Sequence, residues 1–127
     1  VTHSPIEAIL EDLLVKYLAP ATRQTAQRTV STPFGQYRPD FFLVDPVTRR
    51  LLVLECDGRE YHDHVRDAWR DAAMLGCGAV HDLLRIEGKD LKRRPHDVLY
   101  LLARLFPTLF LPRALLVLER EASPEAR

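Results

Sequence analysis

Residues 38–62 read RPDFFLV, DPVTRR, LLVLECDG and REYH in order, and this stretch decides the fold. Two apolar runs rich in β-forming residues flank six turn-forming residues, which predicts a β-hairpin. A loop that is symmetric about its middle pairs Phe42 with Val53, Asp40 with Glu55, and Arg38 with Asp57. Both faces of this hairpin carry apolar side chains, so we expect helices on both faces of the sheet.

Three carboxylates gather at the end of the hairpin that lies away from its loop. Opposed residues share a face of a sheet, as do residues two apart on one strand, so Asp40, Glu55 and Asp57 lie on the same face. Like charges about 4 Å apart repel by roughly 4 kcal/mol near a protein surface. Two arrangements would relieve this repulsion. Oxygen ligands suit Mg²⁺ or Mn²⁺ between the carboxylates, and Arg38 offers a salt bridge to Asp57.

Composition limits the class of protein. A chain of 127 residues is the size of one domain with its own core. Its 18 basic and 18 acidic residues cancel, so any contact with nucleic acid must come from a local patch. The 2 cysteines have no CxxC spacing, which indicates a reducing compartment without a disulfide framework. With no signal peptide and no apolar run that could span a bilayer, we expect a cytoplasmic protein without a membrane partner.

A capped helix begins the chain. Ser4 can cap, Pro5 fits the first helical position, and Glu7 completes a capping box. The helix then presents one apolar stripe and ends before Pro20; the stripe consists of Ile6, Ile9, Leu10, Leu13, Leu14, Tyr17 and Leu18. Glu7 has two interpretations, as a capping residue only or as a further carboxylate beside the cluster.

A polar strand and a crossover helix flank the hairpin. Residues 23–31 predict a strand with one solvated face, and residues 32–35 predict a turn into the hairpin. A second helix is expected at 64–75, and its inward residues are predicted to be Val65, Ala68, Trp69, Ala72 and Leu75. The charged residues of that helix are expected on solvated or flanking faces, held by local pairs; they are Arg66, Asp67, Arg70 and Asp71.

The rest of the chain alternates between strand and helix. Residues 76–78 close the second helix, and residues 79–86 predict a buried strand parallel to residues 51–57. Pro95 opens a helix whose inward residues are predicted to be Val98, Leu99, Leu102 and Phe106. Residues 107–127 are expected to form a C-terminal extension whose end, 123–127, is disordered. Its apolar run at 109–118 leaves open a packed helix, a strand or a contact with another subunit.

Two further motifs carry possible chemistry. His62 and His64 lack companions at zinc-binding spacing, so a zinc site is not expected. His62 is by default a solvated loop residue, but it follows Asp57 closely enough to reach the cluster as an acid or base. The basic run Lys89, Lys92, Arg93, Arg94 and His96 suits either a phosphate or a solvated loop.

The order of elements and three motifs resemble a known group of enzymes. The motifs are Pro39-Asp40, Glu55-x-Asp57-Gly58 and Asp67-x-x-Arg70-Asp71. Over residues 4–106 the chain resembles the PD-(D/E)XK nuclease superfamily, and within it the small domains similar to very-short-patch repair endonucleases. The resemblance implies an α/β (α+β sandwich) domain at 1–106 with an αβββαβα restriction-endonuclease-like core. This core has a four-stranded mixed sheet with helices on both faces.

The same resemblance implies a set of site residues. Asp40 and Glu55 would hold Mg²⁺ or Mn²⁺ with help from the main-chain carbonyl of Cys56. Other positions match by motif. Asp57 stands where most members have Lys, and His62 matches a histidine that follows the Asp-Gly pair. Glu7 matches a glutamate of the first helix, Gln24 or Gln27 matches a glutamine of a strand, and residues 84–86 match the strand after the crossover helix. Two departures stand out. The usual Lys is missing, which leaves the water-activating base unassigned, and His81-Asp82 interrupts a strand that is normally apolar.

These observations predict a metal-dependent endonuclease that hydrolyses DNA in a repair, restriction or mobile-element setting. Asp57 or His62 would orient the attacking water or take its proton. The nucleic-acid backbone would be held by Arg59, Arg66, Arg70, Lys92, Arg93 and Arg94. The alternatives are a catalytically inactive nucleic-acid-binding module on the same fold and an RNA-directed nuclease or toxin. Assembly as a homodimer and fusion to further domains also stay open.

Overall fold

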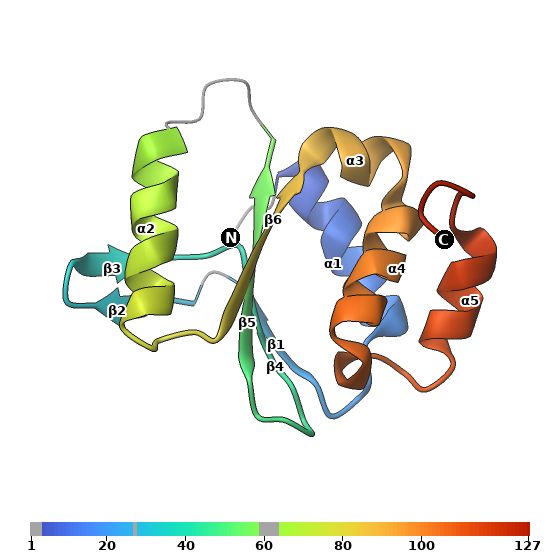
Figure 1. The fold of residues 1–127 in the computed structure, drawn as a ribbon, viewed down its shortest axis with the longest axis horizontal. Coiled ribbons are helices and arrows are strands. Elements are labelled where there is room, and N and C mark those ends of the chain that lie inside the picture. Colours follow the sequence, from blue (N-terminus) through green and yellow to red (C-terminus); the bar gives the residue numbers. More distant parts are fainter. Residues whose placement is uncertain (1–3, 27, 59–63) are drawn as a thin grey trace.

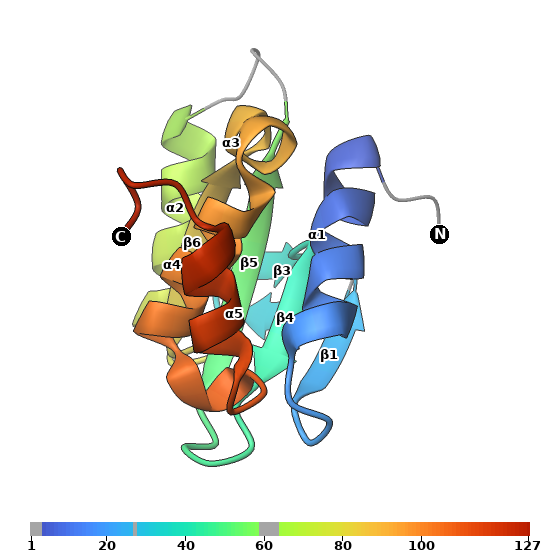
Figure 2. The same ribbon diagram turned by 90° about the vertical axis from the view of Figure 1, so that its right-hand side faces the viewer.

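The computed structural model describes residues 4–26, 28–58 and 64–127. A central sheet divides the molecule into layers (Figure 1). Helix α2 (His64–Gly76) covers one face, together with the small hairpin of β2 (Val30–Thr32) and β3 (Gly35–Tyr37). Helices α1 (Pro5–Tyr17), α3 (Gly88–Arg93) and α4 (Pro95–Leu105) cover the other face, and α5 (Ala114–Glu121) lies outside α4 (Figure 2). Helices therefore lie on both faces of the sheet, as the apolar character of both hairpin faces predicts.

The central sheet is four-stranded and mixed, in the order β1-β4-β5-β6. Its strands are β1 (Arg23–Ala26), β4 (Phe41–Val44), β5 (Leu51–Asp57) and β6 (Asp82–Glu87). Strand β4 runs antiparallel to both of its neighbours, β1 and β5, and β6 runs parallel to β5. Phe42 pairs with Val53 in the predicted register, so the α+β class, the mixed sheet and the hairpin register are confirmed.

The two faces of the hairpin enter separate cores. Phe41, Leu43, Leu52 and Leu54 pack in the larger core, among the helices α1, α3, α4 and α5. Phe42 and Val53 pack in the smaller core, with Met74 of α2 and with Val80. Because opposed residues share a face, the register places Asp40 and Glu55 at the α2 side of the sheet, just beyond the smaller core.

The single strand predicted at residues 23–31 is wrong in its second half. The chain forms β1, leaves the sheet, and then forms a separate hairpin of β2 (Val30–Thr32) and β3 (Gly35–Tyr37). The predicted turn at 32–35 is confirmed: Thr32 Oγ1 donates to the carbonyl of Gly35 at 2.9 Å and accepts from Phe34 N at 3.1 Å. Gly35 has φ of 140°, a conformation that other residues rarely adopt. Residues 23–31 are too polar to stay in the sheet throughout, and Val30 returns to the smaller core.

The N-terminal helix begins as predicted. Ser4 Oγ accepts a hydrogen bond from the backbone N–H of Glu7 at 3.2 Å, and Pro5 occupies the first turn. The cap therefore uses the main-chain N–H of Glu7. The apolar stripe predicted for this helix is buried at Ile6, Leu10, Leu14 and Tyr17.

The C-terminal segment belongs to the larger core. Of the three alternatives open for residues 109–118, the structure shows a packed helix: α5 buries Ala114 and Leu118 against the core. The segment before it is tied to the end of α1 by a hydrogen bond from Ala19 N to the carbonyl of Leu109, 2.9 Å long. Residues 123–127 were predicted to be disordered. The first of them, Ser123, is held by Asp97 through two hydrogen bonds, from its backbone N–H at 2.7 Å and from its hydroxyl group at 2.6 Å. No helix in the described ranges is long and apolar enough to cross a membrane.

Candidate functional site

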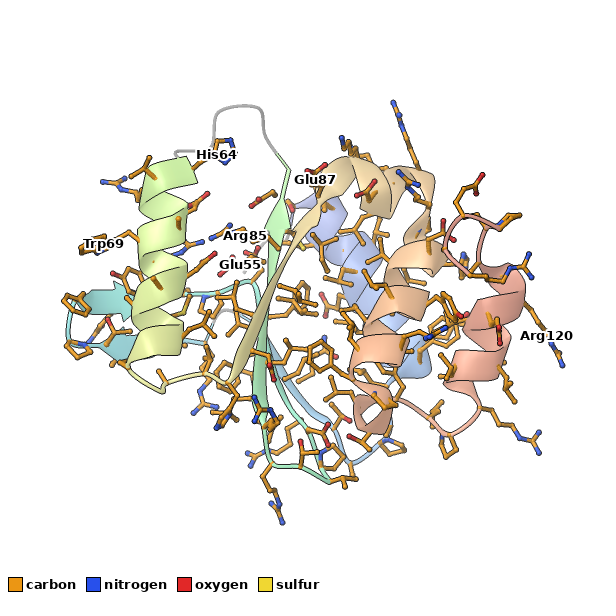
Figure 3. All side chains as sticks on the ribbon, viewed as in Figure 1. Glu55, His64, Trp69, Arg85, Glu87 and Arg120 are labelled. Atoms are coloured by element: carbon orange, nitrogen blue, oxygen red, sulfur yellow. The ribbon has the colours of Figure 1, made fainter. Side chains whose placement is uncertain are left out.

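Helix α2 faces the sheet with the side opposite to the predicted one. Val65 is 81% exposed and Trp69 is 65% exposed, while the buried residues of the helix are Ala73 and Met74. Figure 3 shows Trp69 on the side of α2 that lies away from the sheet. Phe34 of the small hairpin contacts the ring of Trp69 edge-on, with ring centroids 6.2 Å apart, but leaves it exposed. The inward set predicted from the apolar residues of α2 is therefore wrong.

Charged residues occupy the face of α2 that is turned to the sheet. Asp67, Arg70 and Asp71 are partly buried and form ion pairs with residues of β5 and β6. The prediction of a solvated face held by local pairs is wrong for these three residues, and only Arg66 is exposed as expected. The physical reason lies in the sheet, which presents ionised partners there: burying a charge is tolerated when opposite charges meet it.

Arg85 of β6 is the centre of these contacts. Its Nε and Nη2 donate to the two carboxylate oxygens of Asp71, each at 2.7 Å, which is the bidentate geometry of strong ion pairs. Its Nη1 donates to Asp57 Oδ1 at 2.9 Å and lies 3.7 Å from Asp67 Oδ2. Burial alone would lower the pKa of Arg85, but the hydrogen bonds and charges of these three aspartates outweigh burial and raise it. Figure 3 shows Arg85 between α2 and the sheet.

The partner of Asp57 differs from the one predicted. Arg38 was expected opposite Asp57 by extending the hairpin register, but β4 begins only at Phe41 and Arg38 is exposed. The cation that pairs with Asp57 comes from the parallel neighbour β6, where Asp57 lies opposite Glu87 and Arg85 lies two residues earlier. A lone arginine within the apolar run Leu83-Leu84-Arg85-Ile86 was the signal for this role, and the spacing motifs do not include it.

Three carboxyl groups from separate segments meet at the end of the sheet. Asp40 Oδ2 accepts a hydrogen bond of 2.7 Å from Cys56 N, which fixes it against β5. The carboxyl group of Asp40 also lies close enough to those of Glu7 and Glu55 for each of them to shift its pKa. Neighbouring carboxylates repel one another when all are ionised, so a proton or another cation among the three groups stabilises this arrangement. The structure therefore brings together Glu7, Asp40 and Glu55, and it supports the site interpretation of Glu7 over that of a cap alone.

Burial controls the protonation of this cluster. Burial raises the pKa of Asp40, and the neighbouring charge of Glu7 adds to the rise, although the hydrogen bond from Cys56 opposes it. Burial also raises the pKa of Glu55 to about 8; the charge of Arg70 opposes this rise and that of Asp40 adds to it. Without a bound cation, Glu55 is thus a site that takes up a proton near neutral pH.

Glu55 and Arg70 form a loose buried pair. The side chain of Glu55 is 5% exposed, and Arg70 Nη2 lies 3.5 Å from Glu55 Oε2, which is beyond the usual hydrogen-bond distance. Glu55 Oε1 and Arg70 Nε are both buried and have no hydrogen-bond partner among the described residues. The hydrogen-bonding capacity of both groups is therefore not filled.

Cys56 contributes its main chain to the site and its side chain to the core. The thiol packs against the larger core on the opposite face of β5. Burial and the nearby carboxylates raise the pKa of the thiol, which keeps it protonated and excludes it as a thiolate ligand or nucleophile. Its N–H points to Asp40. The N–H and C=O of one strand residue point to the same neighbour, so the carbonyl of Cys56 faces the carboxyl cluster, as the predicted ligand set requires.

The donor set fits a hard divalent cation held partly by substrate. In the described ranges, no group of three or more His, Cys, Asp or Glu side chains is arranged to hold a metal ion by itself. Mg²⁺ is usually bound by one or two carboxylates and completes its shell with water and phosphate oxygens. Asp40, Glu55 and the carbonyl of Cys56 offer that smaller set, and the unpartnered, buried Glu55 Oε1 supplies an oxygen without a competing donor.

A pocket opens beside the cluster. Its volume is about 440 Å³, and it is lined by Ser4, Pro5, Ile6, Glu7, Cys56, Gly58 and Lys92. One wall thus belongs to the cluster, and Lys92 of α3 supplies a positive charge. Of the basic run predicted to bind phosphate, Lys92 is the residue that reaches this pocket, while Arg94 pairs with Asp90 at 3.3 Å and Arg93 is exposed.

Several predicted site residues take no part in this description. Arg59, His62 and Gln27 lie outside the described residues. Gln24 pairs with Leu43, so it lies on the face of the larger core and not on the face of the carboxyl cluster. None of the family models, curated proteins or solved structures compared with the chain matches it, so a function must be inferred from the site itself.

The raised pKa of Glu55 predicts a pH-dependent stability in the presence of a metal chelator. Between its ordinary value of 4.5 and about 8, the unfolded chain has lost the proton that the folded protein retains. The free energy of unfolding should therefore fall as the pH rises through this window. Glu55→Gln should flatten this dependence and, at pH 8.5, stabilise the protein by on the order of 1–3 kcal/mol, because no buried carboxylate is left short of hydrogen bonds.

Thermal and urea unfolding between pH 5 and 9 measure this effect. Glu119→Gln makes the same substitution at an exposed residue of α5 and should leave the parent's pH profile unchanged. A parent profile that is flat from pH 5 to 8 would contradict the burial of an ionisable carboxyl group at Glu55.

Proposed function

We propose that this chain is a metal-dependent phosphodiesterase, most simply a DNA endonuclease of the PD-(D/E)XK type with a restriction-endonuclease-like core. The observation that carries the proposal is the meeting of Glu7, Asp40 and Glu55, from α1, the segment before β4, and β5, at one end of the sheet. Three neighbouring carboxyl groups have little value for stability, since like charges repel one another unless a proton or a cation lies among them. They are well suited to holding a divalent metal against a phosphodiester.

The chain's own residues would divide the catalytic work. A bound Mg²⁺ or Mn²⁺ supplies polarisation of the phosphodiester and acidification of a bound water. Asp40, fixed by Cys56 N, and Glu55 would hold that ion. Asp57 would orient the attacking water, because its hydrogen bond to Arg85 fixes the carboxylate in place. Glu7, next to Asp40, is a further carboxyl group placed to take a proton from that water.

The pocket beside the cluster favours a nucleic-acid backbone as substrate. Lys92 places a cation on the wall of this pocket, which Glu7 of the carboxyl cluster also lines. A phosphate in the pocket would then contact Lys92 and reach the metal at the same time. Because the net charge of the chain is zero, this local arrangement is where phosphate would be attracted.

One observation favours the second candidate, a nucleic-acid-binding module without catalysis. The acidic residues Glu55 and Asp57 are already matched by Arg70 and Arg85, which is how a fold that has lost its metal could keep its carboxylates. The two candidates separate in a single assay. The binding module leaves supercoiled plasmid and structured RNA intact with every divalent metal, whereas the nuclease cuts at least one of them. Cleavage of RNA alone would point to the RNA-directed alternative.

Asp40→Asn is the most direct test of the metal role. The variant should lose Mn²⁺ and Mg²⁺ binding in calorimetry and should slow plasmid cleavage by about a hundredfold or more, because polarisation of the phosphodiester depends on the ion. The fold should survive, since repulsion in the cluster is relieved. Asp12→Asn, at an exposed position of α1, is the matched control and should bind metal and cut as the parent does. Unchanged metal binding by Asp40→Asn would remove the basis of the assignment.

Glu7→Gln separates catalysis from helix capping. The cap uses the backbone N–H of Glu7, which the substitution keeps, so the melting temperature should change little. The rate of cleavage should fall by about a hundredfold, the usual size of the contribution of one acid–base group. Glu11→Gln, one turn further along α1, should cleave like the parent. Full activity in Glu7→Gln would reduce Glu7 to a structural residue.

A further inference from the structure

The two arginines between α2 and the sheet are held very differently. Arg85 is fixed by hydrogen bonds of 2.7–2.9 Å to Asp71 and Asp57. Arg70 lies 3.5 Å from Glu55 and 4.0 Å from Asp67, and its buried Nε has no partner among the described residues. Arg85 is therefore anchored at its place, whereas Arg70 occupies its place without directed hydrogen bonds.

The contact between Arg70 and Glu55 uses the carboxylate that the metal would need. Glu55 is 4% exposed, so once it is ionised its charge must be met from within the protein when no metal is present. Arg70 provides that charge from the α2 side, while Glu55 Oε1 stays unpartnered. A guanidinium and a divalent cation on the same carboxylate would repel each other strongly in this buried setting.

Arg70 has a second carboxylate within reach on its own helix. Asp67 lies three residues earlier, with its Oδ1 4.0 Å from Arg70 Nη2 and its Oδ2 3.7 Å from Arg85 Nη1. If Arg70 moves away from Glu55, its positive charge can therefore still pair with Asp67. The side chain is also 28% exposed, so its route leads toward solvent and not into the core.

We propose that Arg70 is an internal counter-ion of Glu55 that a divalent cation displaces, and that the displaced guanidinium then holds the phosphate of the substrate. The inference rests on the proposed function, because the cation site is the same. It also explains how a residue predicted to bind the nucleic-acid backbone can lie against a buried glutamate: the contact belongs to the metal-free protein. Metal and Arg70 exclude each other at Glu55, and substrate binds best after the exchange.

The exchange has two consequences of opposite sign. Without Arg70 the metal no longer competes with a resident cation, so it binds more tightly. Without Arg70 the substrate loses a phosphate contact, so DNA binds more weakly and is cut more slowly. An arginine with a merely structural role would not produce tighter metal binding together with slower cleavage.

Calorimetry with Ca²⁺ and with Mn²⁺, on the full chain without DNA, tests the first consequence. At a pH above about 8, where Glu55 of the parent is ionised and no proton competes with the ion, Arg70→Met should lower the Kd for the ion by roughly tenfold, a usual size for coupling between neighbouring charged groups. Arg70→Gln should act in the same direction, which keeps the test valid if one variant folds poorly. Arg66→Met removes the same charge from an exposed position of the same helix and should leave the Kd for the ion within about twofold of the parent's.

A second set of measurements follows Arg70 and the substrate. In the parent, saturation with Ca²⁺ should shift the Arg70 Nε–H resonance and leave that of Arg85 in place. In Ca²⁺, Arg70→Met should bind a DNA duplex more weakly than the parent, and in Mg²⁺ it should cut plasmid more slowly.

Three results would overturn the inference. The first is an unchanged or higher Kd for the ion in both Arg70 variants. The second is an equal decrease of this Kd in Arg66→Met, and the third is an Arg70 Nε–H resonance that does not shift when the ion is added. If the parent nonetheless binds metal and cuts DNA, the proposed function stands and only the exchange fails. A parent protein that neither binds metal nor cuts any nucleic acid would contradict both the proposed function and the exchange.

Discussion

A layer of charge joins helix α2 to the sheet, and the rest of the site depends on it. Arg85 binds Asp71 on the helix and Asp57 on β5, so one side chain fixes the distance and rotation of α2 relative to the sheet. Buried ion pairs of this kind contribute little net stability, because removing charge from water offsets most of their attraction. Their value here is positional: they hold acidic groups close together that would otherwise separate.

The carboxyl cluster follows from that arrangement. With α2 in place, Glu55 has no route to solvent, and its pKa rises to about 8 because of burial. Asp40 is held beside it by Cys56 N, and Glu7 arrives from the start of α1. A protein that needed only stability would gain by replacing such groups with apolar ones. Three carboxyl groups at the end of a sheet, next to a pocket with a lysine, are what the proposed binding of a cation and a phosphate-containing ligand would require.

Local sequence signals predicted most of the fold. The turn residues at 45–50 set the hairpin register, so the pairing of Phe42 with Val53 and the approach of Asp40 to Glu55 could be predicted. Ser4 and Pro5 marked the start of α1, and the strand–helix–strand order implied that β6 runs parallel to β5. Each of these features is decided by neighbours in the chain, which is why one sequence sufficed.

The rotation of α2 could not be predicted in the same way. Hydrophobic periodicity assumes that the apolar side of a helix turns inward. Here the inward side carries Asp67, Arg70 and Asp71, because Arg85 and Glu55 of the sheet form ion pairs with them. Trp69 is consequently 65% exposed. The roles of Arg85 and Arg70 depend on contacts between distant segments that no spacing motif records. The single strand predicted at residues 23–31 is wrong for a related reason. The sequence of a polar segment does not indicate which half of it pairs with the central sheet.

Anomalous diffraction from crystals grown with Mn²⁺ tests the central claim most directly, because it locates the ion and the side chains around it together. The account predicts one peak between the carboxylates of Asp40 and Glu55, near the carbonyl of Cys56, with Arg70 turned away from Glu55 and Arg85 still bound to Asp71. Crystals that contain Mn²⁺ but show no peak at these carboxylates, with Arg70 still against Glu55, would contradict it.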